Sequence, residues 1–213
     1  MADFVATAAS AAATLCDDEV QVWQLPYRRS EGREPLRRML ASCLAVDADA
    51  LAFVHGAHGR PVLDAPHAGL DFSWSHSGGR ALLALARGLP ELGVDIERMR
   101  PRPRALELGA RFFAADEGAL LQQLPEAARG AAFLALWTAK EAVLKGTGRG
   151  LAYGLERVAF TLDGEHVPRP AHFAGAAGPA ADWHIQSLRP GPGFIGAVAW
   201  RGKRRRVRAF TLA

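Results

Sequence analysis

Cysteine is scarce in this sequence, with only Cys16 and Cys43 among 213 residues. Two thiols cannot form the disulfide framework that stabilises small secreted domains, and their spacing does not match a metal-binding motif. The chain also lacks any run of about 18 apolar residues, which is the length that a membrane-spanning helix needs. These absences argue against a disulfide-rich or membrane protein and favour a cytoplasmic protein with reduced thiols.

The N-terminal segment lacks the positive charge with which an export signal begins. Residues 1–16 carry Asp3 and are rich in alanine rather than leucine. A secretory signal instead has a basic start followed by a strongly apolar stretch. We therefore expect residues 1–16 to form a flexible N-terminal extension, loose or partly helical, that is not cleaved.

The composition is otherwise that of a globular protein, with 49% hydrophobic and 23% charged residues. The net charge of +4 favours acidic partners, which include phosphorylated small molecules, acidic proteins and nucleic acid. The basic run at 202–208 (GKRRRVR) has little of the aromatic interleaving of a nucleic-acid interface. We expect this run to be a solvated surface and expect no nucleic-acid partner.

The first half of the chain has the periodicity of strands with one helix. Apolar residues at helical spacing predict a helix over 35–44, where Pro35 suits the first turn. Turn signals at HSGG and GLPE predict that the last three strands form an antiparallel meander. The predicted strands cover residues 19–25, 50–54, 70–75, 81–86 and 92–97.

Two prolines make residues 99–104 (MRPRPR) a linker, since they break both helices and central strands. Beyond the linker we expect helices at 106–113, 117–124 and 129–146, and strands at 158–162, 183–188, 195–200 and 207–212. A Pro/Gly/Ala-rich loop is expected at 168–181.

The predicted fold class is therefore α+β, with two similar, pseudo-symmetric subdomains at 17–100 and 101–213. Each is expected to pack a helix on a small antiparallel sheet, with the active site in the cleft between them.

Two carboxylates lie on one face of the strand predicted at 92–97. Asp95 and Glu97 are two residues apart, so their side chains point the same way. A hard divalent ion such as Mg²⁺ would compensate their repulsion. On its own, however, this spacing is more typical of a solvated edge strand.

Other candidate residues are ambiguous when taken singly. Glu141 and Lys145 are four residues apart on a helix, which also describes an ordinary surface ion pair. Ser75 and His76 precede a double glycine, which suits either a phosphate-binding turn or a capped turn. A serine-hydrolase arrangement is less favoured, because adjacent strand residues project to opposite faces.

Five motifs, taken together and in order, favour a functional site over these ordinary alternatives. They are GRPVL (59–63), FSWSHS (72–77), GVDIE (93–97), RFFAADE (111–117) and WTAKEAVLKGTGRGL (137–151). In this series the chain resembles the 4′-phosphopantetheinyl transferases, specifically the surfactin-type branch with two pseudo-symmetric halves on one chain. The resemblance covers about residues 28–160, and its most specific motifs are GVDIE and the W-x-x-K-E-A-x-x-K block.

The resemblance implies an enzyme that transfers the 4′-phosphopantetheine group of coenzyme A to a serine of an acyl or peptidyl carrier protein. It implies Mg²⁺, with Mn²⁺ as an alternative, and release of 3′,5′-ADP. From the composition and this resemblance together, we expect a cytoplasmic monomer without a membrane or nucleic-acid partner. Fatty-acid, polyketide and nonribosomal-peptide carriers all remain open.

The resemblance also assigns roles to individual residues. The implied metal ligands are Asp95, Glu97 and Glu141, and the implied catalytic residues are Glu141, Lys145 and Asp95. The implied coenzyme A-binding residues are Arg28, Arg60, Ser75, His76, Lys140 and Lys145.

This sequence departs from the family pattern in two places. Few residues separate Leu25 from Arg28, where relatives often have a longer helical segment, and Ser73 stands where asparagine is common. Two other functions fit the same motifs: a non-catalytic module that binds coenzyme A or a carrier protein, and a metal-dependent phosphodiesterase that cleaves coenzyme A.

Overall fold

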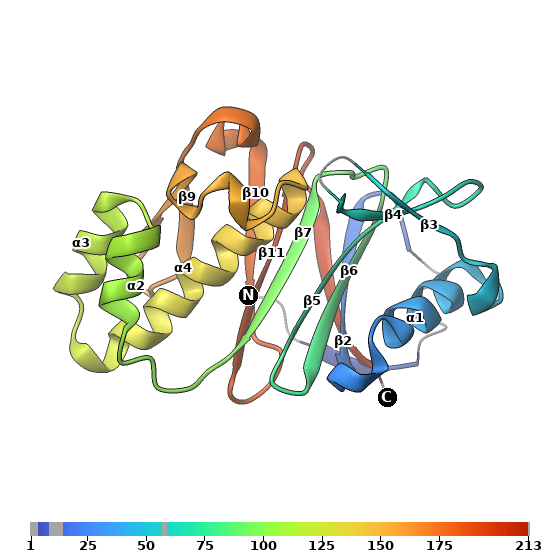
Figure 1. The fold of residues 1–213 in the computed structure, drawn as a ribbon, viewed down its shortest axis with the longest axis horizontal. Coiled ribbons are helices and arrows are strands. Elements are labelled where there is room, and N and C mark those ends of the chain that lie inside the picture. Colours follow the sequence, from blue (N-terminus) through green and yellow to red (C-terminus); the bar gives the residue numbers. More distant parts are fainter. Residues whose placement is uncertain (1–3, 9–14, 57–58, 213) are drawn as a thin grey trace.

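The computed structural model describes residues 4–8, 15–56 and 59–212. The chain forms an α+β fold in which two main sheets lie side by side between helices at either end of the molecule (Figure 1). The helices are α1 (Glu34–Leu44), α2 (Ala105–Phe112), α3 (Ala115–Gln123) and α4 (Glu126–Thr147). None of the helices within the described ranges has the length and apolar character of a membrane span.

The first sheet has the strand order β1-β12-β2-β6-β5. Strands β2, β6 and β5 are antiparallel neighbours, as the alternating pattern predicts, whereas β12 runs parallel to both β1 and β2. On β6, Leu83 and Leu85 face the core under α1, and Leu82 and Ala84 face the second sheet. The strands are β1 (Phe4–Thr7), β2 (Glu19–Pro26), β5 (Leu70–Ser77), β6 (Arg80–Arg87) and β12 (Arg206–Leu212).

Strand β1 corrects part of the expected N-terminal extension. Phe4–Thr7 form a strand, where we expected a loose or partly helical segment, and they pair with Ala209–Leu212 of β12. Pairing satisfies the backbone groups of β12 that would otherwise form an open sheet edge. The remainder of the predicted extension lies mostly outside the described residues.

The second sheet has the order β10-β11-β7, formed by Trp183–Leu188, Phe194–Arg201 and Leu92–Arg98. Helix α4 packs on it so closely that a Cβ at Gly93 would lie 1.8 Å from the carbonyl oxygen of Ala142. The glycine of the GVDIE motif therefore permits the contact between β7 and α4.

The meander predicted for the first half is only partly correct. Strands β5 and β6 pair as expected, but β7 pairs with β11 of the second half and not with β6. The loop predicted at 168–181 is also incorrect in part, since Pro168–Phe173 form β9, which pairs with β8 (Val158–Leu162). Short strands β3 (Phe53–His55) and β4 (Pro61–Leu63) form a separate hairpin.

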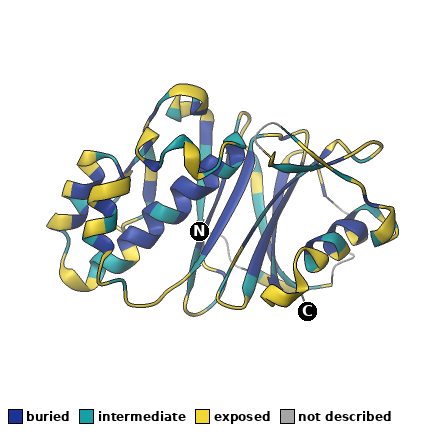
Figure 2. Ribbon diagram, in the orientation of Figure 1, coloured by how far each residue is buried: buried dark blue, intermediate teal, exposed yellow. Residues whose placement is uncertain are grey.

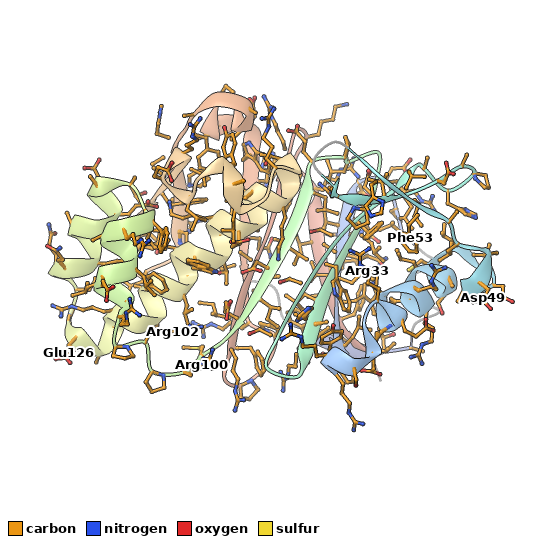
Figure 3. All side chains as sticks on the ribbon, viewed as in Figure 1. Arg33, Asp49, Phe53, Arg100, Arg102 and Glu126 are labelled. Carbon is orange, nitrogen blue, oxygen red and sulfur yellow. The ribbon has the colours of Figure 1, made fainter. Side chains whose placement is uncertain are left out.

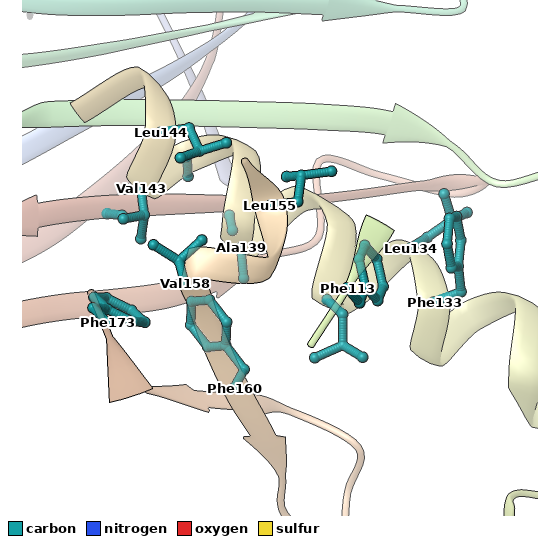
Figure 4. Close-up of a cluster of buried hydrophobic side chains, with 14 of the residues drawn as sticks. Phe113, Phe133, Leu134, Ala139, Val143, Leu144, Leu155, Val158, Phe160 and Phe173 are labelled. Atoms are coloured by element: carbon teal, nitrogen blue, oxygen red, sulfur yellow. The ribbon is translucent and has the colours of Figure 1, made fainter. Parts of the chain in front are cut away.

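Three clusters of buried side chains hold the fold together. One lies between α1 and the first sheet, one between the two sheets, and one around α4. The strands between the helices are accordingly buried along most of their length (Figure 2). In the cluster around α4, Phe133 of the helix packs with the rings of Phe113, Phe160 and Phe173 from neighbouring segments (Figure 4).

Residues 99–104 form an irregular connection between β7 and α2, as their prolines predict. Arg100 and Arg102 lie along this connection, at the lower edge of the molecule in the view of Figure 3. Strand β12, however, returns to the sheet that contains β2, β6 and β5, so residues from both sides of this connection form one sheet.

Candidate functional site

The two sheets meet where β5 lies beside β7, and side-chain hydroxyl groups join them there. Ser73 Oγ accepts a hydrogen bond from the backbone N–H of Val94 at 3.0 Å. Ser77 Oγ accepts one from the N–H of Arg98 at 3.1 Å. Because β5 and β7 belong to different sheets, these hydroxyls supply acceptors that a neighbouring strand would otherwise provide. We call Ser73, Ser75 and Ser77 the serine seam.

Asp95 lies at the middle of this seam and is buried. Its Oδ1 atom accepts hydrogen bonds from Ser75 Oγ and from Lys145 Nζ, both at 2.7 Å. Lys145 Nζ also donates to the carbonyl oxygen of Val94 at 3.2 Å. The second carboxylate oxygen, Oδ2, is buried and has no hydrogen-bond partner, so Asp95 retains one oxygen for a ligand.

Glu141 approaches the same carboxylate from α4. Its side chain is only 9% exposed, and it shares a helix face with Lys145. Burial, reinforced by the negative charge of Asp95, raises the pKa of Glu141 to about 7, although Lys145 opposes the shift. The two carboxylates are therefore brought together in a poorly hydrated space.

Glu97 is also part of this cluster but has a different partner. Burial and the charge of Asp95 raise the pKa of Glu97. Its Oε2 atom accepts a hydrogen bond from Ser77 at 3.2 Å and forms an ion pair with Arg102 at 3.2 Å. From the sequence, Arg102 was predicted only as part of a linker, although its place in the basic run that follows GVDIE was a usable signal.

The donor set fits a hard divalent cation, but the described residues do not form a ready-made cage. No group of three or more His, Cys, Asp or Glu side chains within them is arranged to hold a metal ion. The unpartnered Oδ2 of Asp95 nevertheless lies among carboxylates whose mutual repulsion a cation would relieve. Mg²⁺ suits such a partial set, since it takes few protein oxygens and completes its shell with water and phosphate.

A cavity of about 330 Å³ opens beside Lys145. Positively charged side chains and the aromatic residues Phe72 and Trp74 line its wall, which suits a phosphorylated ligand with a flat ring. The lining residues Arg33, Trp74 and Arg149 were not among the site residues predicted from the sequence.

Ser75 and His76 point in different directions, as adjacent strand residues do. Whereas Ser75 binds Asp95, the His76 ring is exposed and stacks on Tyr27 with 4.4 Å between ring centroids. Partial burial, together with the positive charges of Lys145 and Arg29, lowers the pKa of His76. Arg28 directly follows Tyr27 in the sequence and is exposed.

The structure contradicts the expectation that Lys140 binds coenzyme A. Lys140 is fully buried, and its Nζ atom forms an ion pair with Glu117 at 2.6 Å. The same atom donates to the carbonyl oxygens of Leu155 and Val158. One residue along a helix turns a side chain by about 100°, so Lys140 points toward Glu117 in the core around α4 while Glu141 points toward Asp95.

Arg60 lies at the cavity wall, but its guanidinium group contacts backbone carbonyl oxygens. Of the predicted site residues, the structure thus brings together Asp95, Glu97, Glu141, Lys145 and Ser75. It leaves the side chains of His76 and Arg28 exposed and buries Lys140 in an ion pair with Glu117.

Comparison with known proteins points to one family. A family model described as the 4′-phosphopantetheinyl transferase superfamily matches residues 91–199. The chain is 35% identical over 199 residues to the 4′-phosphopantetheinyl transferase HetI of Nostoc sp., covering 90% of this chain and 80% of that protein. It is 33% identical over 146 residues to the 4′-phosphopantetheinyl transferase psf-1 of Bacillus pumilus, covering 67% of this chain and 60% of that protein. A putative 4′-phosphopantetheinyl transferase of Synechocystis sp. is 41% identical over 127 residues, which cover 59% of this chain and 51% of that protein.

Proposed function

Because the chain belongs to the 4′-phosphopantetheinyl transferase superfamily, we propose that it moves the 4′-phosphopantetheine group of coenzyme A onto a serine of an acyl or peptidyl carrier protein. The reaction is Mg²⁺-dependent and releases 3′,5′-ADP. The observation that carries this proposal is Asp95, which Ser75 and Lys145 hold through one oxygen while the other stays buried and unpartnered.

Asp95, Glu97 and Glu141 would hold the Mg²⁺ ion, for which Mn²⁺ is an alternative. When bound, the ion neutralises negative charge on the coenzyme A pyrophosphate. The Lys145 ammonium group lies 2.7 Å from Asp95, so it is placed to add a positive charge and hydrogen-bond donors at the same phosphates.

The chemical step is a phosphoryl transfer between two oxygens. The carrier serine oxygen attacks the phosphorus that bears pantetheine, and the bond from that phosphorus to the bridging oxygen of the pyrophosphate breaks. The Glu141 carboxylate, or a water that it holds, accepts the proton of the serine hydroxyl. The bond electrons leave with 3′,5′-ADP, whose new negative charge Lys145 stabilises.

The cavity beside Lys145 would take the nucleotide. Arg33 and Arg149 supply positive charge in its wall and Trp74 supplies a flat ring, and the exposed side chains of His76 and Arg28 would bind a phosphate. Acidic carrier proteins would approach along the basic surface near the cleft. We further propose that the protein acts in the cytoplasm as a monomer.

A transfer assay tests the proposal. The protein is incubated with coenzyme A, Mg²⁺ and a panel of apo carrier proteins, and the carrier mass and 3′,5′-ADP are measured together. We expect each modified carrier to gain one phosphopantetheine group with one 3′,5′-ADP released. Removal of divalent ions with EDTA should abolish transfer, and added Mg²⁺ should restore it. Asp95→Asn should lower kcat by on the order of 10²-fold or more, since it removes the ligand charge while keeping the side-chain volume.

Two other results would contradict the proposal. Release of 3′,5′-ADP without a carrier protein would indicate a phosphodiesterase. Binding of coenzyme A without any turnover, across several carrier proteins, would indicate a non-catalytic binding module.

A further inference from the structure

The side chain of Arg60 joins three segments of the chain. Its Nη1 atom donates to the carbonyl oxygens of Lys145 at 2.9 Å and Gly146 at 3.0 Å. Its Nη2 atom donates to the carbonyl oxygens of Phe72 at 2.9 Å and Leu92 at 2.7 Å. Arg60 therefore links β5, the start of β7 and the last turn of α4.

These contacts use the part of the guanidinium group that would grip a phosphate. An arginine carries five N–H bonds, of which four belong to the two Nη atoms. In this structure each Nη atom donates to two backbone carbonyls, so only the Nε hydrogen remains. Two-point recognition of a phosphate needs two parallel donors, and Arg60 has no such pair to offer.

The carbonyl groups that Arg60 contacts on α4 belong to its last turn. Helix α4 ends at Thr147, and the last four carbonyls of a helix lack the regular intrahelical hydrogen bonds. Lys145 and Gly146 supply two of these four, and the Lys145 carbonyl accepts a hydrogen bond from the Gly148 N–H at 3.1 Å as well as the one from Arg60. The helix dipole also places negative charge at this end, so a guanidinium group stabilises the last turn of α4 through both hydrogen bonds and charge.

The same turn of α4 carries a reacting group. The Lys145 side chain reaches Asp95 on β7 at 2.7 Å, while the Lys145 carbonyl is held by Arg60. Glu141 lies one turn earlier on the same helix face. The position of α4 against β7 therefore decides whether Lys145 and Glu141 meet Asp95.

We propose that Arg60 is a positioning residue, which holds the last turn of α4 against β5 and β7 so that Lys145 and Glu141 meet Asp95. This inference rests on the proposed transferase function, and it replaces the phosphate-binding role that the family resemblance implied for Arg60. A lysine cannot take over this role, because its three donors radiate from one nitrogen atom and cannot span carbonyls of three segments.

Three variants test the inference against the phosphate-ligand role. Arg60→Lys keeps the charge but loses the planar group, and Arg60→Ala loses both. Arg149→Ala is the matched control, since it removes an exposed positive charge from the wall of the same cavity. Kinetics are measured at a temperature where circular dichroism shows every variant to be folded, together with hydrogen–deuterium exchange over residues 142–148.

We expect both Arg60 variants to lower kcat by on the order of 10²-fold, the cost of a misplacement of about 1 Å, while the KM for coenzyme A changes less than about threefold. Amide exchange over residues 142–148 should become faster in both. Arg149→Ala should raise the KM for coenzyme A and leave kcat and the exchange rates as in the wild type.

Other results would overturn the inference. If Arg60→Lys keeps the wild-type kcat and KM while Arg60→Ala raises the KM for coenzyme A more than about tenfold, Arg60 is a phosphate ligand. If exchange becomes faster while kcat stays unchanged, the contact is only structural. An inactive wild-type protein would contradict the proposed function. In that case the exchange measurement still tests the positioning role, because amide exchange over residues 142–148 that is as slow in the Arg60 variants as in the wild type would refute it.

Discussion

At the scale of single residues, the Ser73 hydroxyl accepts a hydrogen bond that a backbone carbonyl of a neighbouring strand would accept in a continuous sheet. The N–H of Val94 is buried at the junction of the two sheets and donates to Ser73 Oγ at 3.0 Å. A buried N–H without an acceptor costs about 1–3 kcal/mol. This contact gives Ser73 a clear structural role where the family pattern commonly has asparagine, whose side-chain oxygen is also an acceptor.

The contact predicts the effect of substituting Ser73. Ser73→Ala leaves the Val94 N–H without its acceptor, so we expect the free energy of unfolding to fall by about 1–3 kcal/mol, measured by urea denaturation. Ser73→Thr keeps an Oγ atom and should recover most of this loss. Equal losses in the two variants would show that packing, and not the hydrogen bond, stabilises this position.

At the scale of elements, α4 carries charged side chains on two of its faces, and each face contacts a different part of the molecule. Glu141 and Lys145 face Asp95, whereas Lys140 pairs with Glu117 of α3 inside the core around α4. Glu117 also accepts hydrogen bonds from the N–H groups of Ala114 and Phe160. This buried network ties α3 and β8 to the helix that carries the site.

Removing one member of a buried ion pair is strongly destabilising, because the remaining charge stays in a dry interior. We expect Lys140→Met to lower the free energy of unfolding by about 3–5 kcal/mol. The double variant Glu117→Gln/Lys140→Met should lose less than the sum of the two single variants, as measured by a urea double-mutant cycle.

Kinetics of the same variant decide between the two roles considered for Lys140. The folded fraction of Lys140→Met should keep a KM for coenzyme A close to that of the wild type, because the side chain does not reach the cleft. A rise in KM of more than about tenfold with unchanged stability would restore the phosphate-binding role that the resemblance implied.

At the scale of the whole molecule, Glu19 stabilises the pairing of β12 with β2 in the first sheet through ion pairs. Its side chain is fully buried on β2 and pairs with Arg206 and Arg208 of β12 at 3.4 and 3.5 Å. Burial by itself would raise the pKa of Glu19. Hydrogen bonds from the Gln21 side chain and the Cys16 N–H, with the charge of Arg208, outweigh that effect and hold the pKa below its ordinary value of 4.5.

The lowered pKa predicts acid sensitivity. A carboxyl group with a lower pKa in the folded state stabilises the fold above its unfolded pKa, and that contribution is lost as the pH falls through the folded pKa. Glu19→Gln should therefore be less stable than the wild type at pH 7, and the difference should shrink as the pH falls below about 4.5. Urea denaturation at a series of pH values measures it. Glu165→Gln, at an exposed turn, is the control, and a difference independent of pH would contradict the assignment.

The limits of sequence reasoning follow from the range of each interaction. The alternation at 19–25 and 81–86 was enough to predict β2 and β6, because burial on alternate positions is a local property. The pairing of β7 with β11 was not predictable, since either edge of β7 could have been paired and the partner is distant in sequence. The predicted division into 17–100 and 101–213 stays a prediction.

The site shows the same contrast. The cluster of Asp95, Glu141 and Lys145 could be anticipated from the order of the motifs. The positions of Lys140 and Arg60 could not, because they depend on which buried charge or carbonyl lies nearby in the fold.

The place of β12 between β1 and β2 has a consequence for synthesis on the ribosome. Residues 19–87 contain β2, α1, β5 and β6, and they emerge long before Arg206–Leu212. Because translation adds about 5–20 residues per second, one edge of β2 stays unpaired for several seconds before β12 has been synthesised. The first sheet can be completed only after translation has passed residue 212, so a ribosome that stalls within the second half leaves an exposed strand edge for chaperones to protect.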